Sequence, residues 1–290
     1  MIVKSHAKIN LTLDITGVLP NGYHTVEMVM QSVSLCDEVK LDHSNNNQIN
    51  LRCTKPYIPI NNRNVAYKAA EAFLNATKVK HTGVYIKLYK NIPVSAGLAG
   101  GSSNAAAVLV GLNRLFGTGL TNEELCKLGV HLGADIPFCI MGGTMLAQGI
   151  GEKLSPLPQM PECYILLVKP PLNVSTEAAY RKYNRTLLAN RPDTRAMTKA
   201  LEAGDTFQIS KNMRNVFEEL VVLKHVEKIK RKLLEREALG AQMSGSGPTV
   251  IGIFDDKSRA NNCAIYMRKL YKDVFLCEPV NYGVRIVENS

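Results

Sequence analysis

A glycine-rich stretch with the sequence PVSAGLAGGSSNAAAVL, residues 93–109, has the composition of an anion-binding loop. Glycine permits positive φ values, so backbone N–H groups can close on an anion where such a loop enters a helix. The segment before it, GVYIKLYK, alternates like a strand, and the apolar residues after it recur at helical spacing. A flexible interdomain linker is the alternative, but a linker would not be bracketed so closely by periodic elements.

Two common phosphate loops do not fit this stretch. A Walker A loop has Lys directly after its last glycine, whereas Gly101 is followed by Ser102. The dinucleotide-binding pattern G-x-G-x-x-G fails as well, because the residue two places after Gly97 is Ala99. A phosphate bound here would therefore be held by another arrangement of backbone amides.

Asp135 is a candidate for acid–base chemistry, which needs an ionisable group in a fixed position. It follows a helix that begins with the capping box Thr121 and Glu124 and stops at Gly133, and it precedes Pro137. On local sequence alone an ordinary turn aspartate is the preferred interpretation, and a catalytic carboxylate is the alternative.

Lys8 and Asn10 lie in a segment, residues 3–15, that alternates between apolar and polar side chains and predicts a half-buried strand. The two residues are two positions apart on the polar face, so their side chains point the same way. An isolated strand lysine is usually a surface residue. The shared face with Asn10 is what makes Lys8 a candidate.

Two further stretches are candidates for substrate contact. Tyr23 and His24 follow an Asn-Gly turn, where a strand start is the preferred interpretation. An aromatic ring beside a histidine can also read a nucleobase, by stacking and by hydrogen bonding to its edge. Residues 243–249, MSGSGPT, are a second glycine turn and predict a tight entry into the strand that follows.

The pattern P-x-x-x-G-L-x-G-G-S-S-x-A-A-A resembles the phosphate loop of the superfamily of galactokinase, homoserine kinase, mevalonate kinase and phosphomevalonate kinase, the GHMP kinases. Together with AKINLTL, NGYHTVEMVMQSV, GADIPFCIMGGT and MSGSGPTVIGIF it resembles the ordered motifs of one of its families, the 4-diphosphocytidyl-2-C-methyl-D-erythritol kinases. The match extends from Ala7 to Phe254, and such an ordered set is far more specific than one glycine loop. The family's usual loop has Gly where Ser95, Ala96 and Ala99 stand here.

This resemblance implies roles for individual residues. Asp135 would be the base that receives the proton of the acceptor hydroxyl, and Lys8 would orient Asp135 and steady the transferred phosphoryl group. Asn64, which also caps a helix predicted over residues 65–77, and Lys90 would lie near the adenosine of ATP. The residues expected to hold the ATP phosphates are Pro93, Val94, Ser95, Ala96, Gly97, Leu98, Ala99, Gly100, Gly101, Ser102 and Ser103. Those expected to bind the acceptor are Asn10, Tyr23, His24 and Tyr180, with Tyr180 covering one face of a cytosine.

The implied activity is ATP-dependent phosphorylation of the C2 hydroxyl of 4-diphosphocytidyl-2-C-methyl-D-erythritol, in the non-mevalonate pathway to isoprenoid precursors. Mg²⁺ would accompany ATP through the phosphate oxygens, with a hydroxyl of Ser102 or Ser103 as a possible contributor. No acidic pair marks a metal site of the protein's own. A kinase for homoserine or mevalonate is the alternative within the superfamily, and an aromatic clamp for a nucleobase argues against it.

The expected fold is α+β with two lobes, residues 1–154 and 155–290, and an active site in the cleft between them. The proline-rich segment SPLPQMPE marks the junction. The resemblance implies a ribosomal-S5-like domain for the N-terminal, ATP-binding lobe and a ferredoxin-like domain for the C-terminal lobe.

Composition limits the partners. The chain has 290 residues, 46% of them hydrophobic, and a formal net charge of +10, which favours anionic ligands and makes an RNA-binding protein the alternative from a different class. The densest basic run, residues 224–237, is most simply a solvated amphipathic helix, because no aromatic residues interleave its charges. We expect small-molecule substrates, no nucleic acid, no membrane span or leader, a cytoplasmic location, and a monomer or weak homodimer.

Overall fold

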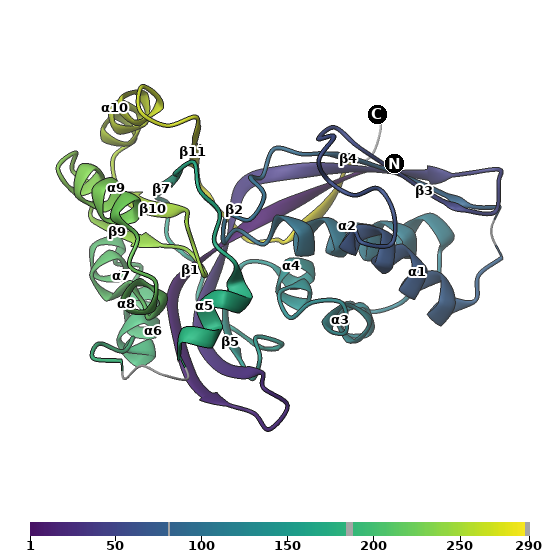
Figure 1. The fold of residues 1–290 in the computed structure, drawn as a ribbon, viewed down its shortest axis with the longest axis horizontal. Coiled ribbons are helices and arrows are strands. Elements are labelled where there is room, and N and C mark those ends of the chain that lie inside the picture. The colour runs from purple at the N-terminus through teal and green to yellow at the C-terminus, as the bar shows by residue number, and fades with distance from the viewer. Residues whose placement is uncertain (81, 184–187, 288–290) are drawn as a thin grey trace.

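The structure is a computed structural model that describes residues 1–80, 82–183 and 188–287. Two groups of elements lie side by side along the longest axis (Figure 1), and on one of them Ile2 near the N-terminus pairs with Val287, the last described residue. The first half of the chain forms β1 (Ile2–Val18), β2 (His24–His43), β3 (Ile49–Cys53), α1 (Val65–Thr77), β4 (Val84–Tyr89), α2 (Gly100–Phe116), α3 (Asn122–Val130), α4 (Ile136–Met141), β5 (Thr144–Gln148) and β6 (Lys153–Pro156). The second half forms β7 (Tyr164–Lys169), α5 (Thr176–Tyr183), α6 (Thr194–Glu202), α7 (Thr206–Asn212), β8 (Arg214–Asn215), α8 (Phe217–Leu220), α9 (Lys224–Leu234), β9 (Gly240–Met243), β10 (Val250–Phe254), α10 (Lys257–Arg268), β11 (Asp273–Cys277), β12 (Pro279–Val280) and β13 (Val284–Val287).

The first sheet is built on one long antiparallel pair, β1 and β2. Around that pair the order is β13-β1-β2-β4-β3, with β12 and β5 also pairing with β2, and β8 pairing with β1. The pairing of β1 with β2 shifts register between His6 and Lys8, between Asn10 and Thr12, and between Ile15 and Gly17. Such bulges bend a strand and re-aim its side chains. The pair therefore continues beyond the helices of the first lobe and reaches into the second (Figure 1).

Helices α1 to α4 cover one face of this sheet. Val39 and Leu41 of β2 belong to the same buried apolar cluster as Phe73 of α1, Leu109 of α2 and Ile140 of α4. Helix α1 begins where Asn64 accepts a hydrogen bond from the backbone of Ala66, which confirms the predicted cap. The capping box that begins α3 is also present.

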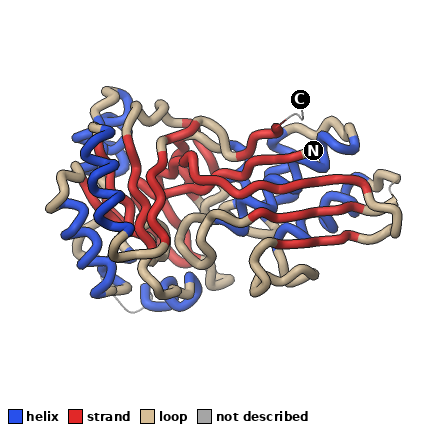
Figure 2. The backbone as a smooth tube through the Cα atoms, turned by 90° about the horizontal axis from the view of Figure 1, so that it is seen from above, coloured by secondary structure: helices blue, strands red, loops and turns tan. Residues whose placement is uncertain are grey.

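The second sheet is antiparallel, in the order β11-β7-β10-β9. Residues of β7 alternate between two cores: Leu166 and Val168 pack with α9 and α10, whereas Ile165 and Leu167 pack with Ile9 of β1. Figure 2 shows the long strands extending along the molecule, with helices of the second lobe gathered at one end. Because β1 contributes to both cores, it joins the two lobes.

The prediction of a half-buried first strand is wrong in one respect. The strand forms, but its polar face is not exposed to solvent. Lys8 is 5% exposed, and Asn10 and Thr12 are fully buried. The glycine loop and the turn at residues 243–249 cover this face, since the backbone N–H of Lys8 donates to Leu98 and that of Asn10 donates to Ser244 Oγ. Alternation identified the two faces correctly but carried no information about what would cover the second.

The first sheet draws on both halves of the chain. Strands β8, β12 and β13 come after residue 154 and pair with β1 or β2. The lobe boundary after residue 154 stays a prediction. Within the described ranges, no helix combines the length and apolar composition that a bilayer span requires.

Candidate active site

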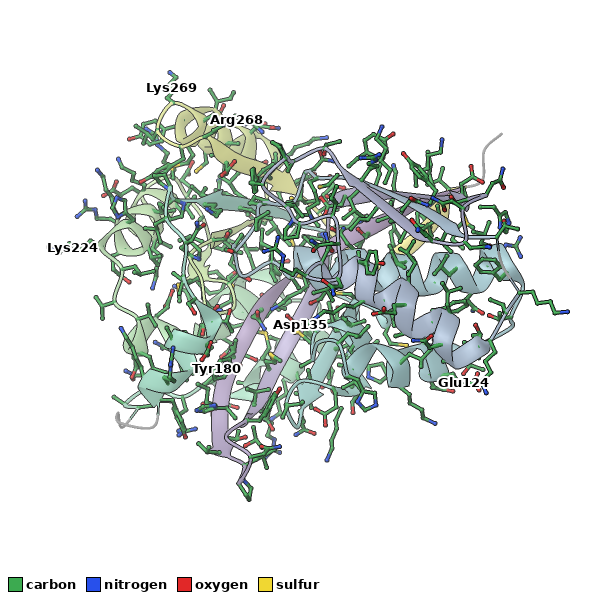
Figure 3. All side chains as sticks on the ribbon, turned by 45° about the vertical axis from the view of Figure 1, so that its right-hand side comes forward. Glu124, Asp135, Tyr180, Lys224, Arg268 and Lys269 are labelled. Atoms are coloured by element: carbon green, nitrogen blue, oxygen red, sulfur yellow. The ribbon has the colours of Figure 1, made fainter. Side chains whose placement is uncertain are left out.

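A cavity of about 960 Å³ brings together most of the residues singled out in the sequence. The lining residues from those predictions are Lys8, Tyr23, His24, Asn64, Lys90, Pro93, Val94, Ser95, Ala96, Gly97, Leu98, Ala99, Gly100, Gly101, Ser102, Asp135 and Tyr180. Asn10 and Ser103 lie behind the wall instead. In the view of Figure 3, Asp135 and Tyr180 lie in the middle part of the molecule, between its two ends.

The glycine loop takes left-handed backbone conformations at three positions, Ser95 (φ 52°), Gly97 (φ 73°) and Ala99 (φ 55°). Two of these residues carry a Cβ, which makes that conformation unfavourable by roughly 1–2 kcal/mol each. Helix α2 begins at Gly100 directly after Ala99, and no side chain caps it. The backbone N–H groups of its first turn therefore face the cavity without an intrahelical acceptor, as anion binding requires.

Gly97 is the point where this loop touches the second glycine turn. A Cβ added there would lie 2.1 Å from the carbonyl oxygen of Ser244. The Ser244 hydroxyl also donates to the carbonyl oxygen of Gly97 at 3.0 Å. Gly245 and Ser246 line the same cavity, so the turn borders the cleft as well as forming the predicted entry into β10. Only glycine permits this close approach of two backbones.

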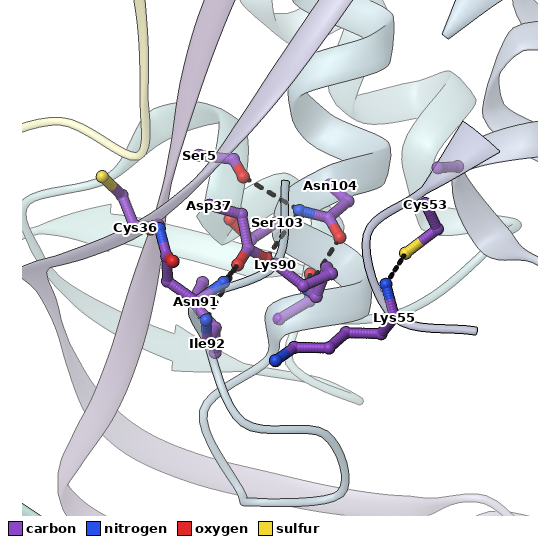
Figure 4. Close-up of polar contacts among 12 residues, drawn as sticks. Ser5, Cys36, Asp37, Cys53, Lys55, Lys90, Asn91, Ile92, Ser103 and Asn104 are labelled. Atoms are coloured by element: carbon purple, nitrogen blue, oxygen red, sulfur yellow. Dashed lines mark hydrogen bonds and ion pairs between the residues drawn. The ribbon is translucent and has the colours of Figure 1, made fainter. Parts of the chain in front are cut away.

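Asp37 anchors the start of the loop, and the sequence reasoning missed it (Figure 4). Its buried carboxylate forms an ion pair with Lys90 Nζ. It also accepts hydrogen bonds from the backbone N–H groups of Asn91 and Ile92, at 2.7 and 2.8 Å, and from Asn104 Nδ2 at 2.9 Å. One side chain thus ties β2 to the chain entering the loop and to helix α2.

The signal for Asp37 was present in the sequence. Asp37 is two residues before Val39 and four before Leu41, so the alternation of a strand places all three side chains on the same face. A carboxylate is therefore expected on the inward, otherwise apolar face of this part of the strand. A charge in that position must have a partner. Lys90 supplies that partner and is only 8% exposed, although a strand lysine is usually a surface residue.

Asp135 lies directly before α4, with Pro137 in the first turn of that helix. Its carboxylate makes no capping hydrogen bond, and its side chain is 33% exposed to the cavity. Lys8 Nζ is 3.9 Å from Asp135 Oδ2 and donates to Asn10 Oδ1 at 2.8 Å. The arrangement holds an ammonium group in place beside a carboxylate that caps no helix.

Aromatic rings form another part of the wall. The His24 ring lies 4.9 Å from that of Tyr180 and 5.6 Å from that of Tyr183, and Tyr180 meets Phe217 edge-on at 4.9 Å. Burial, and to a lesser extent the charge of Asp135, raises the pKa of Tyr180, which keeps its hydroxyl neutral. Tyr23 is 60% exposed and stands at the rim. The rings can therefore offer faces and an imidazole edge to a planar ligand.

Two predicted site residues do not reach the cavity surface. Ser103 is fully buried and donates its hydroxyl to the carbonyl oxygen of His6 at 2.8 Å. Asn10 is fully buried as well, and it contacts the site through Lys8. Asn64 does reach the cavity, and its predicted role as the cap of α1 is confirmed, whereas its place beside the adenosine of ATP stays a prediction.

The connection between β3 and α1 also lines the cavity, and the sequence reasoning did not select it. Tyr57, Ile58, Pro59 and Arg63 contribute from this connection. Thr176 of α5 contributes as well, and its hydroxyl lies 2.8 Å from that of Ser246 in the second glycine turn. The connection has no periodicity, so nothing in its spacing pointed to the site.

Two family models match the chain. The model for the GHMP kinases N terminal domain covers residues 64–143, and that for GHMP kinases C terminal covers residues 197–273. The first match contains the glycine loop and Asp135.

Curated relatives are similar over nearly the whole chain. A 4-diphosphocytidyl-2-C-methyl-D-erythritol kinase of Clostridium novyi is 43% identical, and the match covers 97% of this chain and 100% of the relative. One of Lachnoclostridium phytofermentans is 45% identical over 92% of both chains.

Solved structures of GHMP kinases are also similar to this chain over nearly its whole length. The crystal structure of a 4-(cytidine 5'-diphospho)-2C-methyl-D-erythritol kinase has a TM-score of 0.81 at 29% identity, and the match covers 96% of this chain and 99% of that one. A homoserine kinase from Cytophaga hutchinsonii has a TM-score of 0.79 at 19% identity, covering 99% and 97%, and shows the shared fold alone. The expected α+β, two-lobed GHMP kinase fold is confirmed.

Proposed function

The chain belongs to the 4-diphosphocytidyl-2-C-methyl-D-erythritol kinases, a family of GHMP kinases, and from this we propose that it phosphorylates the C2 hydroxyl of that substrate with ATP. The product would be the 2-phosphate, within the non-mevalonate route to isoprenoid precursors. The observation that carries the proposal is a single cavity lined both by the uncapped start of α2 and by Asp135 with Lys8 beside it.

The acceptor side of the reaction would depend on Asp135. Its carboxylate accepts the proton of the C2 hydroxyl as the hydroxyl oxygen attacks the γ-phosphorus of ATP, and the bond from that phosphorus to the β,γ-bridging oxygen breaks to release ADP. Lys8, held by Asn10, orients the carboxylate and offsets negative charge on the transferred phosphoryl group. Such a transfer requires positioning and electrostatic stabilisation more than covalent catalysis.

The donor side would depend on the backbone of the loop. The amides between Gly97 and Ser102 hold the phosphates of ATP, while Asn64 and Lys90 lie towards the adenosine. Within the described chain, no group of three or more His, Cys, Asp or Glu residues is placed to hold a metal. The site thus suits a Mg²⁺ that arrives on the phosphates, with Asp135 and the Ser102 hydroxyl as nearby protein oxygens, and this ion would neutralise phosphate charge.

The cytidine end of the acceptor would lie against the aromatic wall. Tyr23 and Tyr180 offer ring faces to the cytosine, and His24 offers a polar edge. A methylerythritol diphosphate tail then extends towards Asp135. We expect the enzyme to act in the cytoplasm on these small molecules, as a monomer or weak homodimer.

A comparison of three acceptor alcohols tests the proposal. Purified protein is incubated with Mg·ATP and, separately, with the cytidylyl alcohol, homoserine or mevalonate, and ADP release is measured. Only the cytidylyl alcohol should support turnover. Turnover with homoserine or mevalonate but not with it would assign the protein to another GHMP activity, and salt-sensitive RNA retention without ATP turnover would favour the nucleic-acid alternative.

A further inference from the structure

A second cavity, of about 680 Å³, lies in the C-terminal part of the molecule and shares no lining residue with the first. It is formed by the end of β7, one face of α9, and the connection from α10 to β11. Figure 3 places Lys224 of this cavity at the outer edge of the molecule, away from Asp135. The proposed kinase reaction uses none of its residues.

Its lining is strongly cationic. Five lysines line it, against a single carboxylate, Asp273: Lys169, Lys224, Lys228, Lys232 and Lys272. Throughout the described part of the chain, none of the five lies within 4.0 Å of a carboxylate oxygen. By contrast, Lys230 on the same helix pairs with Glu218 and Glu227. Among the described residues, no close carboxylate therefore balances the charge of these five lysines, although Lys232 donates to the Tyr266 hydroxyl at 2.9 Å.

Lys169 is the deepest of these groups, at 9% exposure. Its Nζ donates to the carbonyl oxygen of Leu172 at 3.0 Å and, at 3.4 Å, to the carbonyl oxygen of Pro170 and to Asn173 Oδ1. All three acceptors are neutral. They orient the ammonium group but leave a buried charge without a counter-ion, which is unfavourable unless an anion joins it.

Helix α9 adds an ordered row of charge. Lys224, Lys228 and Lys232 recur every four residues, so they lie on one face, and Val226 and Ile229 are buried on another. Like charges at this spacing repel one another. The helix starts without a side-chain cap, so the partial positive charge of its first turn adds to that of the lysines. An anion in the cavity would offset both the repulsion between the lysines and the partial positive charge at the start of the helix.

We propose that this cavity is a binding site for a small polyanion with two or three phosphate groups. The lysines come from three separate segments and converge on one open cavity of limited size, which suits a compact ligand better than an extended nucleic acid. Several linked phosphates match several ammonium groups, whereas a single phosphate would contact fewer of them.

Calorimetric titration with inorganic tripolyphosphate tests the proposal. One equivalent of an unreactive ATP analogue, together with the acceptor alcohol, is first bound at the active site, so that the phosphate loop cannot bind the probe while no excess of analogue is left to occupy the second cavity. Wild-type protein should bind one further tripolyphosphate, with weaker affinity at higher salt. The double variant Lys228→Gln/Lys272→Gln should bind it about tenfold more weakly or worse. Titration with ADP under the same conditions distinguishes an organic phosphate from an inorganic one, and binding of either supports the site.

Matched variants make the result decisive. Lys127→Gln/Lys153→Gln removes two exposed lysines of the first lobe and should leave the affinity unchanged. Asp273→Asn removes the one carboxylate of the cavity and should strengthen binding. No binding beyond the active site, equal affinity in the two double variants, or retention of RNA but not of tripolyphosphate would overturn the proposal.

Discussion

Asp135 and Lys8 lie at ion-pair distance in the cavity without a short contact between them. Lys8 Nζ is 3.9 Å from Asp135 Oδ2, and its shorter contact, 2.8 Å, is with Asn10 Oδ1. The backbone around Asp135 leaves the carboxylate without a capping bond. The proposed role of Asp135 as general base needs a carboxylate that other groups leave available, and this geometry is compatible with that role.

Replacing Asp135 with Asn removes the proton acceptor while preserving the size of the side chain. If the carboxylate is the general base, kcat should fall by roughly 10²- to 10⁴-fold, with ATP affinity little changed because the phosphate loop is untouched. Steady-state kinetics with the cytidylyl alcohol and a titration with an ATP analogue measure the two quantities. A fully active variant would remove Asp135 from the mechanism.

Asp37 should be essential for stability although it lies outside the cavity wall. Asp37→Asn leaves the buried ammonium of Lys90 without its counter-ion, and breaking a buried pair in this way costs about 3–5 kcal/mol. Urea unfolding measures the loss. Asp42→Asn, an exposed position on the same strand, is the control and should stay within about 0.5 kcal/mol of wild type. Equal stability of the two variants would contradict the role assigned to Asp37.

At the scale of elements, the site depends on two glycine turns from different lobes that pack backbone to backbone. The loop before α2 and the turn after β9 meet at Gly97 and Ser244. Asn215 of β8 holds the second turn, because its side-chain amide donates to the carbonyl oxygens of Met243 and Gly245. The phosphate loop is thus shaped by contacts with distant segments as well as by its own sequence.

Gly97→Ala and Gly101→Ala separate these contributions. At Gly97 a Cβ would collide with Ser244 and the positive φ would add about 1–2 kcal/mol of strain, so unfolding free energy should fall by at least that amount. At Gly101 a Cβ meets nothing within 4 Å, and Ala is the better helix former, so stability should be unchanged or higher. Thermal unfolding of the two proteins compares them directly, and a Gly97→Ala protein as stable as Gly101→Ala would refute the close contact.

At the scale of the whole molecule, the chain closes on itself near its two ends. His6 of β1 donates its backbone N–H to Gly283 at 2.8 Å, and its ring meets Tyr282 edge-on at 4.9 Å. The Nδ1 atom lies 3.0 Å from the carbonyl oxygen of Val33, while among the described residues Nε2 has no hydrogen-bond partner. A buried imidazole of this kind is held neutral. Burial, and more weakly the charges of Lys4 and Arg285, lowers the pKa of His6 below its usual 6.5.

This histidine should make the fold sensitive to acid. Below about pH 6.5 the unfolded chain binds a proton at this position that the folded protein resists, so stability is kept above that pH and declines as pH falls towards the lowered pKa. Unfolding free energy measured between pH 7.5 and about pH 5 should fall less steeply in His6→Asn, whose amide can still donate to Val33. His131→Asn, at an exposed position, is the control, and identical slopes in all three proteins would exclude His6 as the source.

The sequence by itself determined the local elements and the family. Spacing placed the glycine loop between β4 and α2, Asn64 at the start of α1, and the capping box at α3, because caps and periodicity act within a few residues. The same information predicted an amphipathic helix within residues 224–237, and Val226, Ile229 and Leu233 form the buried face of α9. It did not reveal that lysines on another face of α9 converge with Lys169 and Lys272.

Tertiary structure alone decided which polar groups are buried and which face the cavity. It covered the polar face of β1, turned Lys90 inward to Asp37, and placed Ser103 and Asn10 behind the wall. The physical reason is that alternation reports only that a strand has two faces. What covers each face depends on segments far away in sequence, here residues 93–103 and 243–249, and their approach depends on packing at Gly97 that no local pattern encodes.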